Sequence, residues 1–362
     1  MSPVAEHMSR AGRRCPGPLA IDRRQLLQTG LVGFSTLSLP ALYRLRAATG
    51  AAGHGERTSI ILIWLRGGCS HLDTFDPKPR ASSAYRSPYE PISTRVPGTQ
   101  VTELLPRLAG IADRFTLLRS IAHDAGGHPA GSLRVLGGDP ARADKPKPIF
   151  PDWMTVAHYL RAAAGPQPLP NYVSINPVDR YDSFQIAGPA YLGPSWEAFK
   201  VTGDPSKPTF AIPNIGLPEG GLERLNRRTS LRGTLDRLRR DLDQGGLMQA
   251  VDDFEAQALS LLTSAEARTA FDLSNESDAT RDRYGRHRWG QQCLLARRLV
   301  EAGVEIIATE FDGPQCGRVS NWDDHAVNHH VFEALAWRAP FFDQAVSALV
   351  EDIYQRGLDR RV

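Results

Sequence analysis

Short runs of apolar, often β-branched residues alternate along the chain with longer segments that have the apolar spacing of helices. The short runs predict strands at 60–65, 115–120, 171–175 and 303–311. Helices are predicted at 102–112, 152–164, 222–262 with a break near Gly245, 280–302 and 331–356. Strands that alternate with helices predict an α/β fold with a mostly parallel sheet, covered by helices on both faces.

Capping residues and prolines refine the predicted helix boundaries. Ser264 has the position of a helix start, and Ser277 or Asp278 is predicted to cap the helix that runs to residue 302. The last helix is expected to kink or restart at Pro340. The segment 176–220 is rich in Pro, Gly and Tyr and is predicted to be irregular.

Three of the predicted strands lead into loops rich in His, Asp and Gly, at 67–79, 121–132 and 321–325. In open α/β sheets ligands bind beyond the carboxyl ends of the strands, so we expect these loops to form three walls of one site. The residues of interest in them are Ser70, His71, Asp73, Asp76, His123, Asp124, His128, Ser132, Asp323 and His325.

Some of these residues have a simpler structural interpretation. Asp73 and Asp76 suit turn positions in which the carboxylate accepts hydrogen bonds from nearby amides, and Pro77 favours this for Asp76. Ser132 suits a helix N-cap. Solvated positions are predicted for Arg281, Arg283, Arg286, Arg288, Arg297, Arg298, His287, His329 and His330, and core positions for Trp289 and Trp337.

Charge and cysteine content exclude some classes of protein. The chain has a net charge of +3, but residues 1–50 contain seven Arg against Glu6 and Asp22, a surplus of +5, so the remaining residues carry −2. This slightly acidic body gives no reason to expect nucleic acid binding. Beyond residue 50 the cysteines are Cys69, Cys293 and Cys316, whose spacing fits neither a disulfide framework nor a paired metal motif.

The first 50 residues have the pattern of an export signal. Arg23 and Arg24 precede a weakly apolar segment, 31–42, which resembles a twin-arginine signal. This segment is shorter than the roughly 20 residues needed to cross a bilayer, and no membrane-spanning segment is expected after it. We therefore predict a signal and leader at 1–50, one α/β domain at 57–362, and a location in the periplasm or at the cell surface.

Several motifs of the body resemble one family, the exported bacterial proteins with "domain of unknown function 1501". They lie at 67–79 (GGCSHLDTFDPKP), 104–108 (LLPRL), 280–285 (TRDRYG), 295–303 (LARRLVEAG) and 322–325 (WDDH). The resemblance implies an α/β core like that of alkaline phosphatases and sulfatases. It also implies that such proteins continue beyond the last helix, so this chain is expected to be truncated at its C-terminus.

The resemblance implies a divalent metal ion, such as Zn, Ca, Mg or Mn, held by Asp and His side chains. The metal candidates are His71, Asp73, His123, Asp323 and His325. The catalytic candidates are Ser70, His128 and Ser132. His128 occupies the position that corresponds to the sulfatase nucleophile when 135–140 is aligned with the sulfatase pattern.

Two functions follow as hypotheses. The first is a metal-dependent hydrolase of sulfate or phosphate esters, with an ester or a polysaccharide as substrate. The second is a catalytically inactive exported binding or scaffold protein with the same fold. The sequence indicates neither the oligomeric state nor the substrate.

Overall fold

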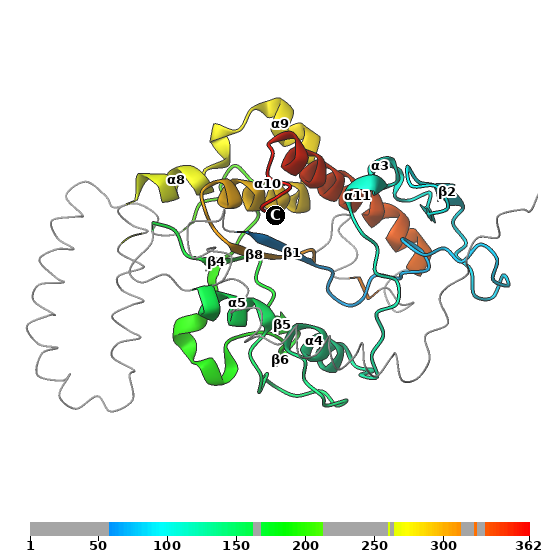
Figure 1. Cartoon of the computed structure of the whole chain (residues 1–362), viewed down its shortest axis with the longest axis horizontal. Coiled ribbons are helices and arrows are strands. Elements are labelled where there is room, and N and C mark those ends of the chain that lie inside the picture. Colours follow the sequence, from blue (N-terminus) through cyan, green and yellow to red (C-terminus); the bar gives the residue numbers. More distant parts are fainter. Residues whose placement is uncertain (1–57, 162–167, 213–259, 261–263, 313–321, 324–329) are drawn as a thin grey trace, which may run out of the picture. The chain divides into compact units, whose positions relative to one another are not determined.

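The computed structural model describes residues 58–161, 168–212, 260, 264–312, 322–323 and 330–362, all within the unit that begins at Thr58. Its main helices and strands are shown in Figure 1. The strands are β1 (Ile60–Trp64), β2 (Pro91–Ser93), β3 (Gln100–Thr102), β4 (Tyr172–Ile175), β5 (Arg180–Tyr181), β6 (Phe184–Gln185), β7 (Phe199–Val201) and β8 (Ile306–Glu310). The α-helices are α3 (Pro106–Gly110), α4 (His128–Gly137), α5 (Trp153–Arg161), α8 (Ala265–Phe271), α9 (Asp278–Tyr284), α10 (Arg288–Glu301) and α11 (Val331–Gln355), and 3-10 turns lie at Ala112–Arg114, Ala190–Leu192, Pro194–Trp196 and Leu273–Asn275.

The central sheet is parallel, as the alternating pattern predicts. Its strand order is β1-β8-β4-β7, and each neighbouring pair runs in the same direction. In the register, Ile306 of β8 lies between Ile60 of β1 and Tyr172 of β4. The two central strands, β8 and β4, are buried along their whole length, which explains their almost continuous apolar sequences.

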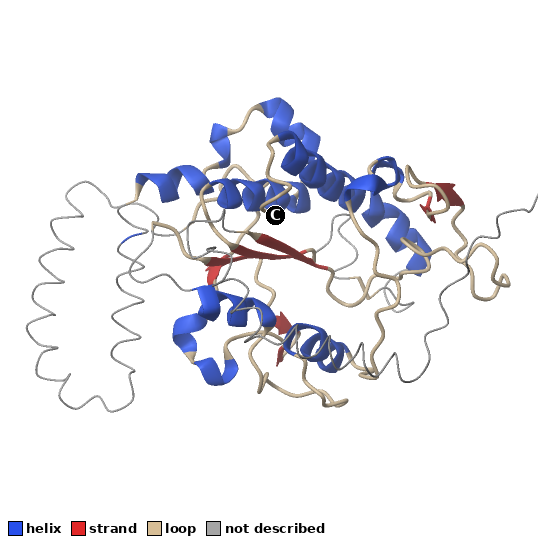
Figure 2. Ribbon diagram, in the orientation of Figure 1, coloured by secondary structure: helices blue, strands red, loops and turns tan. Residues whose placement is uncertain are grey.

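Helices cover both faces of this sheet (Figures 1 and 2). On one face, α8, α9, α10 and α11 pack over Val173, Ile175 and Ile307 in the larger apolar core. On the other, α4 and α5 pack over Ile306 and Ala308 in a smaller core. Successive strand side chains point to opposite faces, so one strand contributes to both cores. The predicted α/β class is therefore confirmed.

The predicted helix at 280–302 is two helices. Gly285 has φ 94 and ends α9, and a new helix, α10, begins at Arg288. Ser277 caps α9, one of the two caps predicted. His287 caps α10, since its Nδ1 accepts a hydrogen bond from the Gly290 amide at 3.2 Å. Because this imidazole is a half-buried cap, the prediction that His287 is solvated is wrong.

The last predicted helix is one continuous helix. α11 runs without interruption through Pro340, so the predicted restart there does not occur. Three residues later, Asp343 accepts hydrogen bonds from the amides of Arg107 and Leu108, both at 2.9 Å. These are first-turn amides of α3, so a side chain of α11 caps this short helix. The helix predicted at 102–112 is correspondingly confined to the five residues of α3.

Two predictions about strands are wrong. Residues 115–120 form no strand, because Phe115 and Leu117 rest against the core while Leu118 is exposed, and no ladder continues through them. Within the segment predicted to be irregular, β7 is a strand of the main sheet and β5 and β6 form a small hairpin. β7 has only three residues, too few for its apolar period to stand out.

The remaining boundaries follow the predictions. Ser264 caps α8 by accepting a hydrogen bond from the Ala267 amide. α5 lies within the predicted 152–164. The long helical segment predicted at 222–262 falls outside the described residues except for Ser260. In the part of the chain that the structure describes, no helix is long and apolar enough to span a membrane.

One of the predicted solvated arginines lies in the protein interior. The side chain of Arg297 is 1% exposed and pairs with Glu276 at 2.8 Å, Glu301 at 2.5 Å and Asp352 at 3.1 Å. Because α10 packs against α11, this side of α10 faces protein and not solvent. Arg286, at 41% exposure beside Asp278 and Asp282, is solvated as predicted.

Candidate active site

Polar residues meet at the carboxyl edge of the central sheet. Arg66 follows β1, Asn176 directly follows β4, Glu310 is the last residue of β8 and Asp312 lies two residues beyond it. Their strands are neighbours in the sheet, so these side chains are gathered by topology. This is the edge at which parallel α/β sheets bind their ligands.

Asn176 ties the ends of β4 and β8 together. It has φ 49, a left-handed conformation that Asn tolerates better than most residues. Its side-chain amide donates to the Glu310 carbonyl at 2.8 Å and to the Asp312 carboxylate at 2.7 Å. Arg288, at the start of α10, donates in turn to the Asn176 side-chain oxygen at 2.6 Å. This network fixes the position of Asp312.

Glu310 is enclosed within this edge. Its side chain is 3% exposed, and its Oε1 lies 3.6 Å from Nε of Arg66. Burial, and secondly the nearby Asp312 carboxylate, raise the pKa of Glu310 from 4.5 to about 8, although Arg66 acts in the opposite direction. Glu310 is therefore mostly a neutral acid at pH 7.

A stack of three side chains adjoins the sheet edge. The guanidinium carbon of Arg66 lies 4.7 Å from the centre of the Tyr181 ring. The imidazole of His128 stacks on the same ring at a centroid distance of 4.7 Å and an angle of 15°. Burial and then the Asp323 carboxylate raise the pKa of Tyr181 to about 12, so this phenol stays protonated at neutral pH.

His128 and Asp323 are in direct contact. Nε2 of His128 lies 2.9 Å from Oδ2 of Asp323, across 195 positions of sequence. His128 is the first residue of α4, and Asp323 follows Trp322, whose amide donates to the Arg66 carbonyl at 2.7 Å. A carboxylate in this position orients the imidazole. Two of the three predicted walls therefore meet here.

The predicted loop at 67–79 contributes differently from expectation. Asp73 accepts hydrogen bonds from the hydroxyls of Ser70 at 2.6 Å and Ser87 at 2.8 Å. Its carboxylate thus holds the loop together as a local structural group, close to the turn interpretation. Asp76 is buried and pairs with Lys78 at 2.6 Å and Arg119 at 3.7 Å, so its carboxylate partners are side-chain cations.

The remaining predicted residues do not join the His128–Asp323 pair. His71 is exposed. His123 is exposed, and its ring lies over Gly131, where an added Cβ would meet it at 3.2 Å. Asp124 forms ion pairs with Arg134 and Arg142. His325 lies outside the described residues.

Ser132 is not the predicted helix cap. It lies inside α4, and its hydroxyl donates to the His128 carbonyl at 2.7 Å. The N-cap is Gly127, and Asp144 accepts a hydrogen bond from the Ala130 amide at 2.9 Å. The N-terminal end of α4, where helices commonly bind anions, therefore already holds a carboxylate.

The described residues do not by themselves fit a metal site. No three His, Cys, Asp or Glu side chains among them are grouped so that they could hold an ion. His128 and Asp323 are a pair of donors without a third from this part of the chain. No catalytic step is therefore assigned to a metal.

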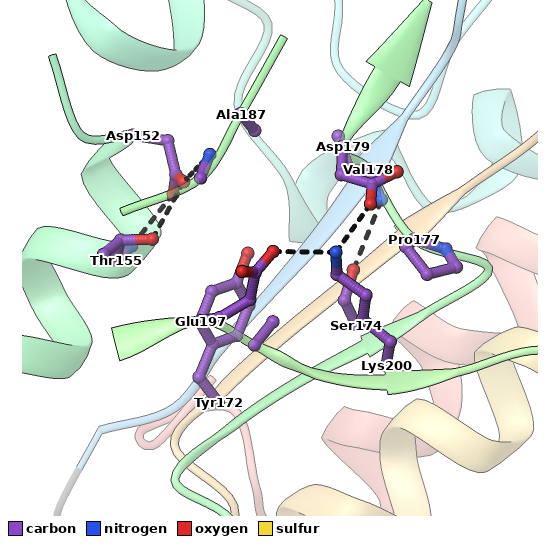
Figure 3. A pocket seen from close by; sticks show the side chains of 12 residues that line it. Asp152, Thr155, Tyr172, Ser174, Pro177, Val178, Asp179, Ala187, Glu197 and Lys200 are labelled. Atoms are coloured by element: carbon purple, nitrogen blue, oxygen red, sulfur yellow. Dashed lines mark hydrogen bonds and ion pairs between the residues drawn. The ribbon is translucent and has the colours of Figure 1, made fainter. Parts of the chain in front are cut away.

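Two hollows elsewhere in the described structure contain none of the predicted site residues. The first, in Figure 3, has a volume of about 10 Å³, room for about one water molecule. In it Lys200 bridges Asp179 and Glu197, at 2.8 Å and 2.7 Å. The second, of about 380 Å³, is lined by two aromatic rings, Phe210 and Phe271, and by residues of the loop 205–212 and of 268–281.

Aromatic and cysteine residues outside the site agree with the sequence predictions only in part. Trp289 is buried, as predicted, and stacks on Phe311 at 5.0 Å, whereas Trp337 is only partly buried. His330 is exposed, as predicted. Cys69 and Cys293 form no disulfide in the described structure. Arg66, Tyr181 and Glu310 were not predicted, although Arg66 and Glu310 lie at or just beyond the end of a strand of the main sheet.

A family model described as "Protein of unknown function (DUF1501)" matches residues 57–361. The chain belongs to the DUF1501 family. No curated protein and no solved structure matches this DUF1501 protein.

Proposed function

We propose that this DUF1501 protein is an exported hydrolase of phosphate or sulfate monoesters, and that its active site is the carboxyl edge of the central sheet. The observation that carries the proposal is the 2.9 Å contact between His128 and Asp323 beside that edge. The parallel sheet and the motifs at 67–79 and 322–325 support a core related to alkaline phosphatases and sulfatases. The arginine pair and apolar segment of residues 1–50 support twin-arginine export.

In this proposal His128 is the general base. Its Nε2 is held by Asp323, which leaves Nδ1 to accept a proton from water as the water oxygen attacks the phosphorus or sulfur atom. The bond to the alcohol oxygen breaks, and the imidazolium returns the proton to that oxygen. Water is the proposed nucleophile in place of a serine. The hydroxyl of Ser70 already donates a hydrogen bond to Asp73, and that of Ser132 donates to a helix carbonyl.

The test measures hydrolysis of an aryl phosphate and an aryl sulfate by the full chain and by His128→Gln. We expect the variant to lose about 10²- to 10⁴-fold in kcat/KM, the usual contribution of a general base. His330→Gln is the control, because His330 is exposed and its ring contacts Phe332. The proposal is rejected if the wild type cleaves neither ester, or if His128→Gln and the wild type are equally fast.

A divalent metal ion is part of the proposal only through the resemblance. Among the described residues Asp323 would be a ligand of this ion, since it was predicted as a metal ligand and contacts His128 in the site. Metal analysis of the purified full chain, followed by chelation, tests this separately. If hydrolysis is unchanged after complete removal of metal, the His128–Asp323 pair acts without an ion.

The second candidate is an exported binding protein that uses the same site without turnover. It is favoured by the engagement of Ser70, Ser132 and Asp73 in mutual or backbone hydrogen bonds. This candidate predicts binding of a phosphorylated or sulfated glycan with no release of the anion. Product release that depends on His128 would eliminate it.

A further inference from the structure

Arg66 is a cation at the sheet edge whose closest partner is at the surface. Its side chain is 18% exposed, and Nη2 donates to Asp182 at 2.9 Å. The Asp182 side chain is 72% exposed. The contacts of Arg66 with Glu310 and Asp312 are longer, at 3.6 Å and 3.9 Å, and its Nε makes no hydrogen bond. The charge of Arg66 therefore has one close counterion, and that counterion is open to solvent.

Asp182 occupies the turn of the β5–β6 hairpin. It follows Tyr181 at the end of β5 and has φ 53, a left-handed conformation that Asp adopts in tight turns. An ion pair with such an exposed carboxylate contributes little to stability, because water competes for both groups. Asp182 can therefore be displaced from Arg66 at low cost.

Arg66 is held in place even when Asp182 leaves. Its guanidinium lies on the Tyr181 ring, and Tyr181 also stacks on His128. A guanidinium held on an aromatic ring loses little freedom when it binds an oxyanion, and its planar edge can donate two parallel hydrogen bonds to such a group. The Tyr181 ring thus contacts both the Arg66 guanidinium and the His128 imidazole and fixes their positions.

We propose that Arg66 binds the tetrahedral oxyanion of the substrate, a phosphate or sulfate monoester, and that Asp182 is the resident counterion that the substrate displaces. This inference rests on the proposed function for the identity of the ester, but not for the binding of the anion. The high pKa of Glu310 supports it, because a neutral Glu310 does not compete with the incoming anion for Arg66.

The experiment titrates inorganic phosphate, and separately inorganic sulfate, into the full chain by calorimetry. Asp182→Asn removes the competing charge and keeps a side chain that tolerates the left-handed turn. We expect it to tighten anion binding about fivefold, the affinity equivalent of a surface ion pair. Arg66→Gln should weaken binding at least tenfold. The anion that binds more tightly identifies the ester class.

Asp124→Asn is the matched control, because Asp124 is also an exposed carboxylate with arginine partners, Arg134 and Arg142, but does not contact Arg66. Its anion affinity should equal that of the wild type. If Arg66→Gln fails to fold, the anion affinity of the Asp182→Asn variant still tests the inference, because Asp182 is exposed. Equal affinity of Asp182→Asn and wild type, or binding of neither anion, overturns the inference.

The result separates this inference from the proposed hydrolysis. Anion binding that responds to Asp182→Asn without any ester cleavage keeps the Arg66 site and rejects the hydrolase. Ester cleavage that depends on His128, with no effect of Asp182→Asn on anion affinity, does the reverse.

Discussion

Glu310 is a carboxylic acid enclosed at the end of the central strand. The unfolded chain has a Glu310 pKa near 4.5, whereas burial and Asp312 raise it to about 8 in the fold. As the pH rises above 4.5 the unfolded chain releases this proton first, so the free energy of unfolding falls until the folded group ionises near pH 8. The residue thus lowers the stability of the fold progressively between about pH 4.5 and pH 8.

Replacing Glu310 by Gln should remove this sensitivity, because the amide has nearly the same shape and cannot ionise. We expect Glu310→Gln to be more stable than the wild type at pH 8 and to differ little from it at pH 4.5. Urea denaturation at a series of pH values measures both. A wild-type advantage that grows between pH 5 and pH 8 would contradict the assignment.

The sequence predicts where the candidate site lies better than it predicts which residues form it. It predicts that the loops containing His128 and Asp323 converge, because both were expected to follow strand ends. It does not predict that Asp73 accepts hydrogen bonds from Ser70 and Ser87, because the position of Ser87 depends on the path of a Pro- and Ser-rich connection. Tyr181 escapes prediction because a two-residue strand has no detectable period.

At the scale of the elements, α10 depends on an unusual cap. His287 accepts the Gly290 amide through Nδ1, and burial lowers the pKa of His287 to about 4. The unfolded chain therefore takes up this proton first as the pH falls below 6.5. The stabilisation that His287 provides is present above pH 6.5 and is lost as the pH falls toward 4.

His287→Ala removes the cap and should cost about 1 kcal/mol at pH 8, the usual value of an N-cap. His287→Asn keeps an acceptor at the cap but does not titrate. It should retain most of the stability at pH 8 and lose less than the wild type between pH 6.5 and pH 4. The midpoints of thermal unfolding of the three proteins give the comparison. Parallel pH profiles for His287→Asn and the wild type would refute the lowered pKa of His287.

The element boundaries that were predicted correctly have local causes. Ser264 and Ser277 cap helices through their own hydroxyls, which a sequence displays directly. The failures depend on distant contacts. Residues 115–120 were expected to form a strand, but Phe115 and Leu117 rest on the core and Leu118 is exposed. α3 depends on Asp343, more than 200 positions away.

At the scale of the molecule, α9, α10 and α11 are joined by a buried ionic network. Arg297 contacts Glu276, Glu301 and Asp352, and Tyr284 donates to Asp352 at 2.8 Å. Removing Arg297 would take one cation from two buried carboxylates, Glu276 and Asp352, although Arg298 and Arg356 would remain paired with them. Such a loss is much more costly than the net contribution of the intact network.

Arg297→Ala should therefore lower the free energy of unfolding by about 3–5 kcal/mol. Arg286→Ala, on the neighbouring surface, should change it far less, because Arg286 is 41% exposed and pairs with Asp278 and Asp282 in water. Urea denaturation of both variants makes the comparison. Equal losses would show that the network does not act as a buried unit.

The position of β8 in the sheet sets the order of folding during synthesis. β8 lies between β1 and β4, so Ile60 finds its partner only when Ile306 has been made. Until then β1 has no partner strand, and β4 can pair only with β7. Pairings so distant in sequence slow folding and prolong the exposure of unpaired edges. A nascent chain stalled before Ile306 should therefore depend on chaperones, and protease resistance should appear abruptly once β8 emerges.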